Sequence, residues 1–146
     1  MKNLKNILST KPNGLLNIYC TAGYPSLDDM PTIVNALHEA GADMVEIGMP
    51  YSDPIADGPT IQESNKIALG NGISIERIFE QLAHCRPEIP KILMGYFNPV
   101  MQYGLERFCQ RCQETGVDGL ILPDLPIEIY ERKYKALFEA HGLSNI

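Results

Sequence analysis

The sequence lacks long hydrophobic runs and has no excess of positive charge. None of its apolar stretches approaches the roughly 20 residues that a membrane-spanning helix needs. Lysine and arginine number 12 against 18 aspartate and glutamate residues, which gives a formal net charge of −6. This balance argues against nucleic acid or an anionic membrane surface as the main partner. Residues 1–6 contain no apolar core of a signal peptide, so we expect a cytoplasmic protein.

The signatures of common nucleotide sites and of serine hydrolases are also missing. The sequence contains no G-x-G-x-x-G fingerprint, no G-x-x-x-x-G-K-[ST] loop and no G-x-S-x-G elbow. Cys109 and Cys112 form one C-x-x-C, but a zinc site would need a second ligand pair at matching spacing. With Leu105 and Phe108 they fall on one face of a helix. Core packing therefore explains them better than metal or redox chemistry, and we expect no metal site.

The chain does contain a regular alternation of short apolar runs and amphipathic stretches. Four apolar runs suit buried strands, at residues 15–20, 43–48, 91–96 and 119–123. Helical patterns follow them, and glycine ends three of these helices, at Gly41, Gly116 and Gly142. This alternation predicts an α/β fold with a parallel sheet and right-handed crossovers.

The helix starts and the loops after the strands carry further signals. Ser26 with Asp29 resembles a capping box, and Ser74 is the expected cap of the next striped helix. The segments after the strands are rich in Pro, Gly and Asp, and we read them as loops: 21–26, 50–59, 98–104 and 124–126. A fifth strand begins at residue 144. Four βα units and the start of a fifth predict half of a (β/α)8 barrel within one domain, residues 1–146, with its site at the carboxyl ends of the strands.

One predicted strand contains a carboxylate where an apolar residue is expected. Alternation along this strand places Val45 and Ile47 on one face and Glu46 on the other. In a barrel the first two would pack under helices, whereas Glu46 would face the barrel mouth. A carboxylate in that place is costly unless it is paired, protonated or useful. Glu46 is therefore a candidate proton shuttle, and the alternative is an ion pair with a Lys or Arg from another strand.

A second carboxylate, Asp57, lies in the loop before the next helix. Acid–base chemistry often uses two carboxylates in different environments, and Asp57 on a loop is wetter than Glu46 on a strand. The sequence Asp57-Gly58 is also ordinary turn chemistry, and an Asp near a helix start is a natural cap. Asp53 could simply shape the loop. A divalent cation held by these three carboxylates and Glu63 is less favoured, because the sequence cannot show that the four converge.

Residues 45–62 closely resemble the signature of the tryptophan synthase alpha subunit family. Segments 19–25, 95–99 and 122–126 are similar to the other strand-end motifs of this family, in the same order and with matching spacing. The resemblance covers essentially the whole chain. It departs from the family at Met49 and Tyr51, where a smaller aliphatic residue and Phe are common.

The resemblance implies a (β/α)8 barrel that cleaves indole-3-glycerol phosphate into indole and glyceraldehyde 3-phosphate. In this family the position of Glu46 is the main general acid–base: it protonates the ring carbon that carries the side chain and takes the proton of the side-chain hydroxyl. Asp57 would stay ionised and accept the indole N–H. The matching positions that line the indole pocket are Tyr19, Ile61, Met94, Tyr96 and Ile121.

The resemblance also implies a partner. The loop 52–59 and the segment 98–104 match regions that face the beta subunit, which makes Asp53, Pro54 and Asn98 interface candidates in an alpha2–beta2 complex. The beta subunit carries pyridoxal phosphate, and this chain is expected to hold no cofactor. The phosphate site of the family lies on later βα loops, so we expect the chain alone to be inactive. Two alternatives stay open: a non-catalytic half-barrel that docks on the beta subunit, and another small-substrate lyase or isomerase on the same barrel.

Overall fold

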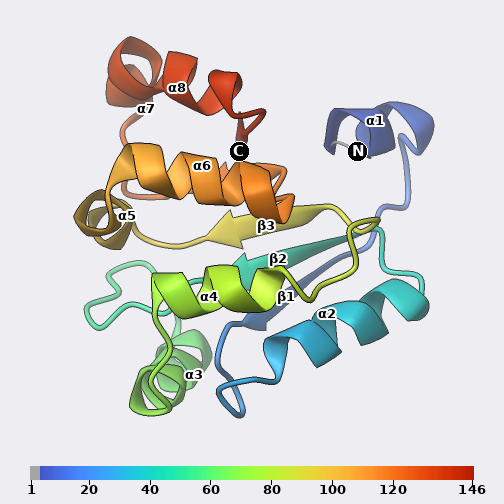
Figure 1. Ribbon diagram of the computed structural model, residues 1–146, viewed down its shortest axis with the longest axis vertical. Helices are drawn as coiled ribbons and strands as arrows, with labels where there is room; N and C mark the ends of the chain where they lie inside the picture. The colour runs from blue at the N-terminus through green and yellow to red at the C-terminus, as the bar shows by residue number, and fades with distance from the viewer. Residues whose placement is uncertain (1–3) are drawn as a thin grey trace.

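A computed structural model describes residues 4–146 of the chain; residues 1–3, the start of the segment inspected for a signal peptide, lie outside the described residues. Five strands form one sheet in the order β1-β2-β3-β4-β5, and each neighbouring pair is parallel (Figure 1). The strands are β1 (Asn17–Thr21), β2 (Met44–Gly48), β3 (Lys91–Met94), β4 (Gly119–Ile121) and β5 (Ser144–Asn145). The predicted parallel sheet is confirmed, and its strands follow one another in sequence order.

Helices follow the first four strands as the alternation predicts, and one further helix precedes the first strand. They are α1 (Leu4–Thr10), α2 (Met30–Glu39), α3 (Pro59–Gly70), α4 (Ile75–Leu82), α5 (Phe97–Tyr103), α6 (Leu105–Thr115), α7 (Ile127–Ile129) and α8 (Lys135–Ala140), with a π-helical turn, η1 (Tyr130–Tyr134), before α8. In Figure 1, α2, α4 and α6 lie over one face of the sheet, whereas α3 and α5 lie at the end to which the strands point. No described helix is long and apolar enough to span a membrane.

The two faces of the sheet have different cores. Val45 and Ile47 are fully buried in the main cluster under the helices, as strand parity predicts. On the opposite face, Met44 and Ile92 pack with Leu4 of α1 in a second, smaller cluster. Helix α1, which was not expected from the sequence, supplies this inner face with an apolar cover.

Two of the predicted helix caps can be compared with the structure. Ser74 caps α4 as predicted, since its Oγ accepts a hydrogen bond of 3.2 Å from the Arg77 amide. At α2 only half of the capping box forms: the Asp29 carboxylate accepts from the Ser26 amide at 3.1 Å. The helix begins later, at Met30, and Asp29 makes no side-chain cap.

The prediction of a loop over 98–104 is wrong, because α5 occupies this segment. Pro99 lies in the first turn of α5, where proline's missing N–H has no intrahelical partner to lose. The amide of Phe97 donates to the Asp124 carboxylate at 2.8 Å, and Val100 is fully buried. The preceding strand is also shorter than predicted and ends at Met94.

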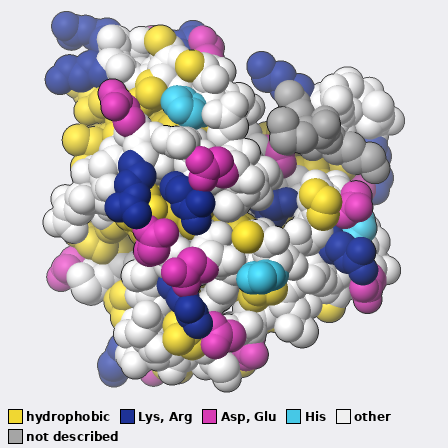
Figure 2. Space-filling view, in the orientation of Figure 1, with side chains coloured by type: hydrophobic (Ala, Val, Ile, Leu, Met, Phe, Trp, Pro, Cys, Tyr) yellow, Lys and Arg dark blue, Asp and Glu magenta, His cyan; other side chains and the backbone are white. Residues whose placement is uncertain are grey.

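The cysteines pack in the core, as predicted. Cys109 and Cys112 are fully buried within the main cluster, and both are free thiols. Burial raises the pKa of the Cys109 thiol to about 11, so it stays protonated near neutral pH. On the outer surface, acidic and basic side chains are intermixed over the helices (Figure 2). There Arg107 reaches across from α6 to Glu76 of α4 at 2.6 Å.

Candidate active site

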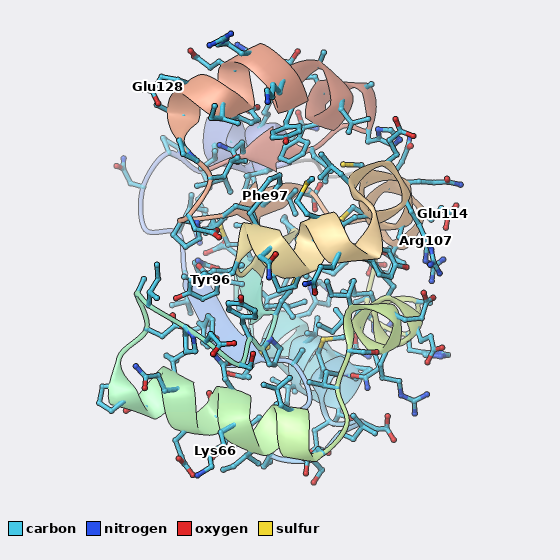
Figure 3. The ribbon with its side chains drawn as sticks, turned by 90° about the vertical axis from the view of Figure 1, so that its left-hand side faces the viewer. Lys66, Tyr96, Phe97, Arg107, Glu114 and Glu128 are labelled. Atoms are coloured by element: carbon cyan, nitrogen blue, oxygen red, sulfur yellow. The ribbon has the colours of Figure 1, made fainter. Side chains whose placement is uncertain are left out.

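The candidate residues gather where the strands end. The loop after β2 carries Asp57 and leads into α3, and the turn after β3 carries Tyr96 and leads into α5. Figure 3 looks onto this end of the sheet and shows Tyr96 between α3 and α5. Parallel strands bring the loops that follow them to the same edge, so residues far apart in sequence meet here.

Glu46 lies on β2, half-buried, on the face opposite the helices. It is paired in register with Tyr19 of the neighbouring strand. The Asn17 side-chain amide donates a 3.0 Å hydrogen bond to Glu46 Oε2. This bond fixes one carboxylate oxygen and leaves the other available to a ligand.

Asp57 is half-buried and is held by the first turns of α3. The Gln62 side chain donates to the Asp57 backbone carbonyl at 2.8 Å, and Asn65 Nδ2 lies 3.4 Å from Asp57 Oδ2. Asn65 is only 4% exposed, and its Oδ1 has no hydrogen-bond partner among the described residues. A buried amide with an unpaired acceptor is unusual and marks this corner as built for polar contacts.

A small cavity lies between these elements. Its lining residues are Tyr19, Gly48, Met49, Asp57, Asn65, Met94, Gly95, Tyr96 and Pro123. The space in it that water can occupy is about 10 Å³, room for roughly one water molecule. The cavity must widen before it can hold a ring the size of indole.

The structure brings together only part of the predicted pocket. Tyr19, Met94 and Tyr96 line the cavity with Asp57, whereas Ile61 and Ile121 are not among its lining residues. The Ile121 side chain packs instead against the inner cluster below the cavity. Glu46 lies two residues before Gly48 on β2 and is also not among the residues that line the cavity. The proposed contacts of Glu46, Ile61 and Ile121 with a ligand therefore stay predictions.

The sequence profile described as tryptophan synthase alpha chain matches residues 4–146. The chain belongs to this family. It is 58% identical over 134 residues to the tryptophan synthase alpha chain of Flavobacterium psychrophilum, covering 90% of this chain and 53% of that protein. It is 51% identical to the alpha chain of Parabacteroides distasonis, covering 100% of this chain and 58% of the relative.

Solved structures of the family have the same fold. The structure of tryptophan synthase subunit alpha from Legionella pneumophila str. Paris superposes with a TM-score of 0.88 at 37% identity, over 94% of this chain and 53% of that chain. A tryptophan synthase from M. tuberculosis, in an aminoacrylate- and BRD0059-bound form, superposes with a TM-score of 0.86 at 32% identity. The match covers 94% of this chain and 55% of that chain. The chain spans about half the length of the relatives it matches, and the five-stranded sheet is half of a tryptophan synthase alpha barrel.

Tyr96 does more in this member of the family than line a pocket. Its hydroxyl accepts hydrogen bonds from the backbone amides of Ile55 and Ala56, at 3.0 and 2.9 Å. Its ring packs against Tyr51, with 5.1 Å between the centroids. Tyr96 is 5% exposed, so the turn after β3 holds the tip of the loop that presents Asp57.

We expect Tyr96→Phe to release this loop while the fold remains. The two amides lose their shared acceptor, which costs roughly 1 kcal/mol per hydrogen bond, and they are free to turn toward water. Hydrogen exchange at Ile55 and Ala56 should become about tenfold faster. Tyr51→Phe is the matched control, because its hydroxyl accepts from Asn98 instead. Unchanged exchange in Tyr96→Phe would contradict the anchoring role.

The predicted interface residues lie at the same end of the sheet. Asp53 and Asn98 are exposed, and Pro54 is partly exposed. Asn98 Nδ2 donates to the Tyr51 hydroxyl at 3.2 Å, and Asp53 accepts from the Ser52 hydroxyl. Tyr51 thus links α5 to the loop after β2, and the three residues form one accessible edge.

Several polar residues of the site were missed by the sequence analysis. Asn17 and Thr21 have the parity of Tyr19, so alternation along β1 could have placed them on the inner face. Ser64 and Asn65 are buried polar residues of α3. Polar side chains on the apolar side of a predicted helix could have indicated a site. Their partners could not be predicted, because Thr21 lies on a strand and Asp57 on a loop.

The inner-face phenol of Tyr19 has an altered acidity. Burial raises its pKa, the hydrogen bond from Thr21 lowers it, and the charges of Asp57 and Glu46 raise it again. Tyr19 therefore stays a neutral hydrogen-bond donor at physiological pH. No group of three or more His, Cys, Asp or Glu side chains suited to a metal occurs within residues 4–146.

Proposed function

We propose that this chain supplies the catalytic carboxylates for cleavage of indole-3-glycerol phosphate to indole and glyceraldehyde 3-phosphate, the lyase step of tryptophan biosynthesis. The observation that carries the proposal is the position of Glu46 and Asp57. Asp57 lines a cavity with Tyr19 and Tyr96, and Glu46 lies on β2 in register with Tyr19, on the face opposite the helices. A carboxylate in an aromatic-lined pocket and a second carboxylate on the neighbouring strand face suit acid–base chemistry on an indole ring.

In the proposed mechanism Glu46 moves both protons. It first gives a proton to the ring carbon that bears the glycerol phosphate side chain, which leaves the ring positively charged. It then takes the proton of the adjacent side-chain hydroxyl, the carbon–carbon bond breaks, and the bonding electrons return to the ring to give indole. Asn17 holds one oxygen of Glu46 at 3.0 Å, which orients the other toward the substrate.

Asp57 has the complementary role of stabilising charge. Its carboxylate accepts the indole N–H and stabilises the positive ring while the side chain leaves. Asn65, 3.4 Å from Asp57 Oδ2, supports the orientation of the carboxylate. The indole ring would lie among Tyr19, Ile61, Met94, Tyr96 and Ile121 once the cavity opens.

The proposed partner is a tryptophan synthase beta subunit, in an alpha2–beta2 complex within the cytoplasm. The beta subunit would carry the pyridoxal phosphate and receive indole, and this chain would hold no cofactor. Asp53, Pro54 and Asn98 support this proposal, because they form one accessible edge next to the loop of Asp57. An interface there would place indole release close to the partner.

The test is indole release from indole-3-glycerol phosphate, measured in three samples. We expect none from the isolated chain, because remote phosphate binding supplies much of the orientation that such a reaction needs. Addition of a beta subunit alone should not produce indole release. Addition of the second half of the Flavobacterium psychrophilum alpha chain should produce indole release.

Each other outcome has a definite meaning. Steady release from the isolated chain would refute its expected inactivity. No release from the completed barrel would refute the proposed lyase function. Tight binding to the beta subunit without any turnover would instead support the non-catalytic docking module.

A further inference from the structure

Three hydroxyl groups connect β1 to α3 behind the candidate pocket. Thr21 Oγ1 lies 3.3 Å from the Tyr19 hydroxyl and 2.9 Å from Ser64 Oγ, and Ser64 Oγ lies 2.9 Å from the carbonyl oxygen of Ile61. Thr21 is 5% and Ser64 9% exposed, so solvent has little access to this chain of hydroxyls. The open end of the chain is the Tyr19 phenol, which lines the cavity with Asp57.

The position of the phenol is fixed by packing. The Tyr19 ring lies against Gly48 so closely that a Cβ added at Gly48 would be 2.0 Å from the phenolic oxygen. Its hydroxyl is also held by the hydrogen bond from Thr21. Displacement of the ring would break both contacts, whereas the hydroxyl hydrogen can turn while the ring stays in place.

The donors along this chain of hydroxyls follow from the geometry. Thr21 donates to the Tyr19 hydroxyl, whereas either atom could donate in the contact between Thr21 and Ser64. Because the Thr21 hydrogen is directed to Tyr19, Ser64 donates to Thr21, and the phenolic hydrogen of Tyr19 is free to point into the cavity. The Ile61 carbonyl, which Ser64 Oγ also approaches at 2.9 Å, can still accept from a backbone amide of α3.

We infer that Tyr19 is a positioning residue that donates its hydroxyl hydrogen to the Asp57 carboxylate when substrate is bound, with Thr21 and Ser64 supplying the hydrogen bond that frees it. This inference rests on the proposed function, because Asp57 is taken to accept the indole N–H. Asn65 approaches Asp57 Oδ2, which leaves the other oxygen for Tyr19. A carboxylate held by two donors keeps one orientation, and an oriented acceptor binds an N–H better.

The electrostatics of the site favour the same arrangement. The burial of Tyr19 and the neighbouring charges of Asp57 and Glu46 raise its pKa, so the hydroxyl keeps its hydrogen at working pH. A neutral donor facing two carboxylates is attracted to them, whereas a third anion would be repelled.

The experiment measures binding of two probes to the 146-residue chain. Indole has the N–H that Asp57 would accept, and benzofuran has the same ring shape with oxygen in its place. The chain contains no tryptophan, so no indole group of the protein contributes to the fluorescence of the probe. We expect Tyr19→Phe to weaken indole binding about fivefold and to leave benzofuran unchanged. Thr21→Val should weaken indole binding in the same direction.

A double-mutant cycle separates positioning from simple packing. In an Asp57→Leu background, Tyr19→Phe should no longer alter indole binding, because both oxygens that could accept from Tyr19 are gone. Tyr103→Phe is the matched control, since its hydroxyl donates to Glu76 on the outer helices. Equal losses for both probes, or additive losses in the cycle, would overturn the inference.

The failure of this inference can be distinguished from failure of the proposed function. If the chain binds indole and Tyr19→Phe has no selective effect, the inference is wrong and the lyase proposal stands. If the chain does not bind indole at all, the inference is overturned for this chain, and the release assay in the completed barrel decides the function independently.

Discussion

Glu46→Gln is expected to lower indole release about a thousandfold in the barrel completed with the second half of a relative. General acid–base groups contribute roughly 10²- to 10⁴-fold, and Glu46 would act twice in the proposed reaction. Glutamine has the same shape but cannot transfer a proton. Its carbonyl can still accept the hydrogen bond of Asn17, which is 3.0 Å long in the structure, so the fold should persist.

The measurement is kcat for indole release, with circular dichroism to confirm that the variant is folded. Glu106→Gln, the same exchange on the exposed surface of α6, is the control and should leave kcat unchanged. A loss of less than tenfold in Glu46→Gln would exclude Glu46 as the main proton shuttle. A fall in kcat with KM unchanged would fit a group that acts on the transition state.

The parallel fold and the placement of the two carboxylates could be predicted from the sequence, because both depend on local regularities. Alternating apolar runs and striped helices predicted a parallel sheet, and strand parity placed Glu46 opposite Val45, as observed. The position of Asp57 can be predicted in the same way, because a Pro- and Gly-rich loop that follows a strand lies at the carboxyl end of a parallel sheet. These inferences need only the period of a strand and the direction of the chain.

The error over α5 has a local cause. Asn98-Pro99 reads as a turn, but proline is equally suited to the first turn of a helix, and the sequence does not choose between the two. The helix is stabilised by the burial of Val100 and by the hydrogen bond from the Phe97 amide to the Asp124 carboxylate. Both depend on neighbours brought close by the sheet.

The contacts that hold the site could not be predicted for a related reason. Tyr96 accepts from Ile55 and Ala56, which are 41 and 40 residues away in sequence. Thr21 meets Ser64 across 43 residues. Such pairs depend on sheet register, loop path and side-chain rotamer together, and no periodicity in the sequence records them.

Gly48→Ala is expected to be the most damaging single-methyl change at the site. The new Cβ would lie 2.0 Å from the hydroxyl oxygen of Tyr19, 2.6 Å from Cζ and 2.9 Å from Cε2. Relief of this clash requires the Tyr19 ring to leave its place across Gly48. Overpacking of this kind costs about 1–3 kcal/mol, and moving the ring also breaks its contact with Thr21.

Urea unfolding of the chain measures this cost directly. Gly70→Ala is the matched control, because a Cβ there meets nothing within 4 Å and alanine favours a helix over glycine, so stability should hold or rise slightly. Tyr19→Leu removes the atoms that clash, and in that background Gly48→Ala should cost much less than in the parent chain. Equal costs in the two backgrounds would show that Gly48 matters for another reason. A non-additive result would show that Gly48 is glycine because the Tyr19 phenol must lie across it, beside Asp57, at the mouth of the barrel.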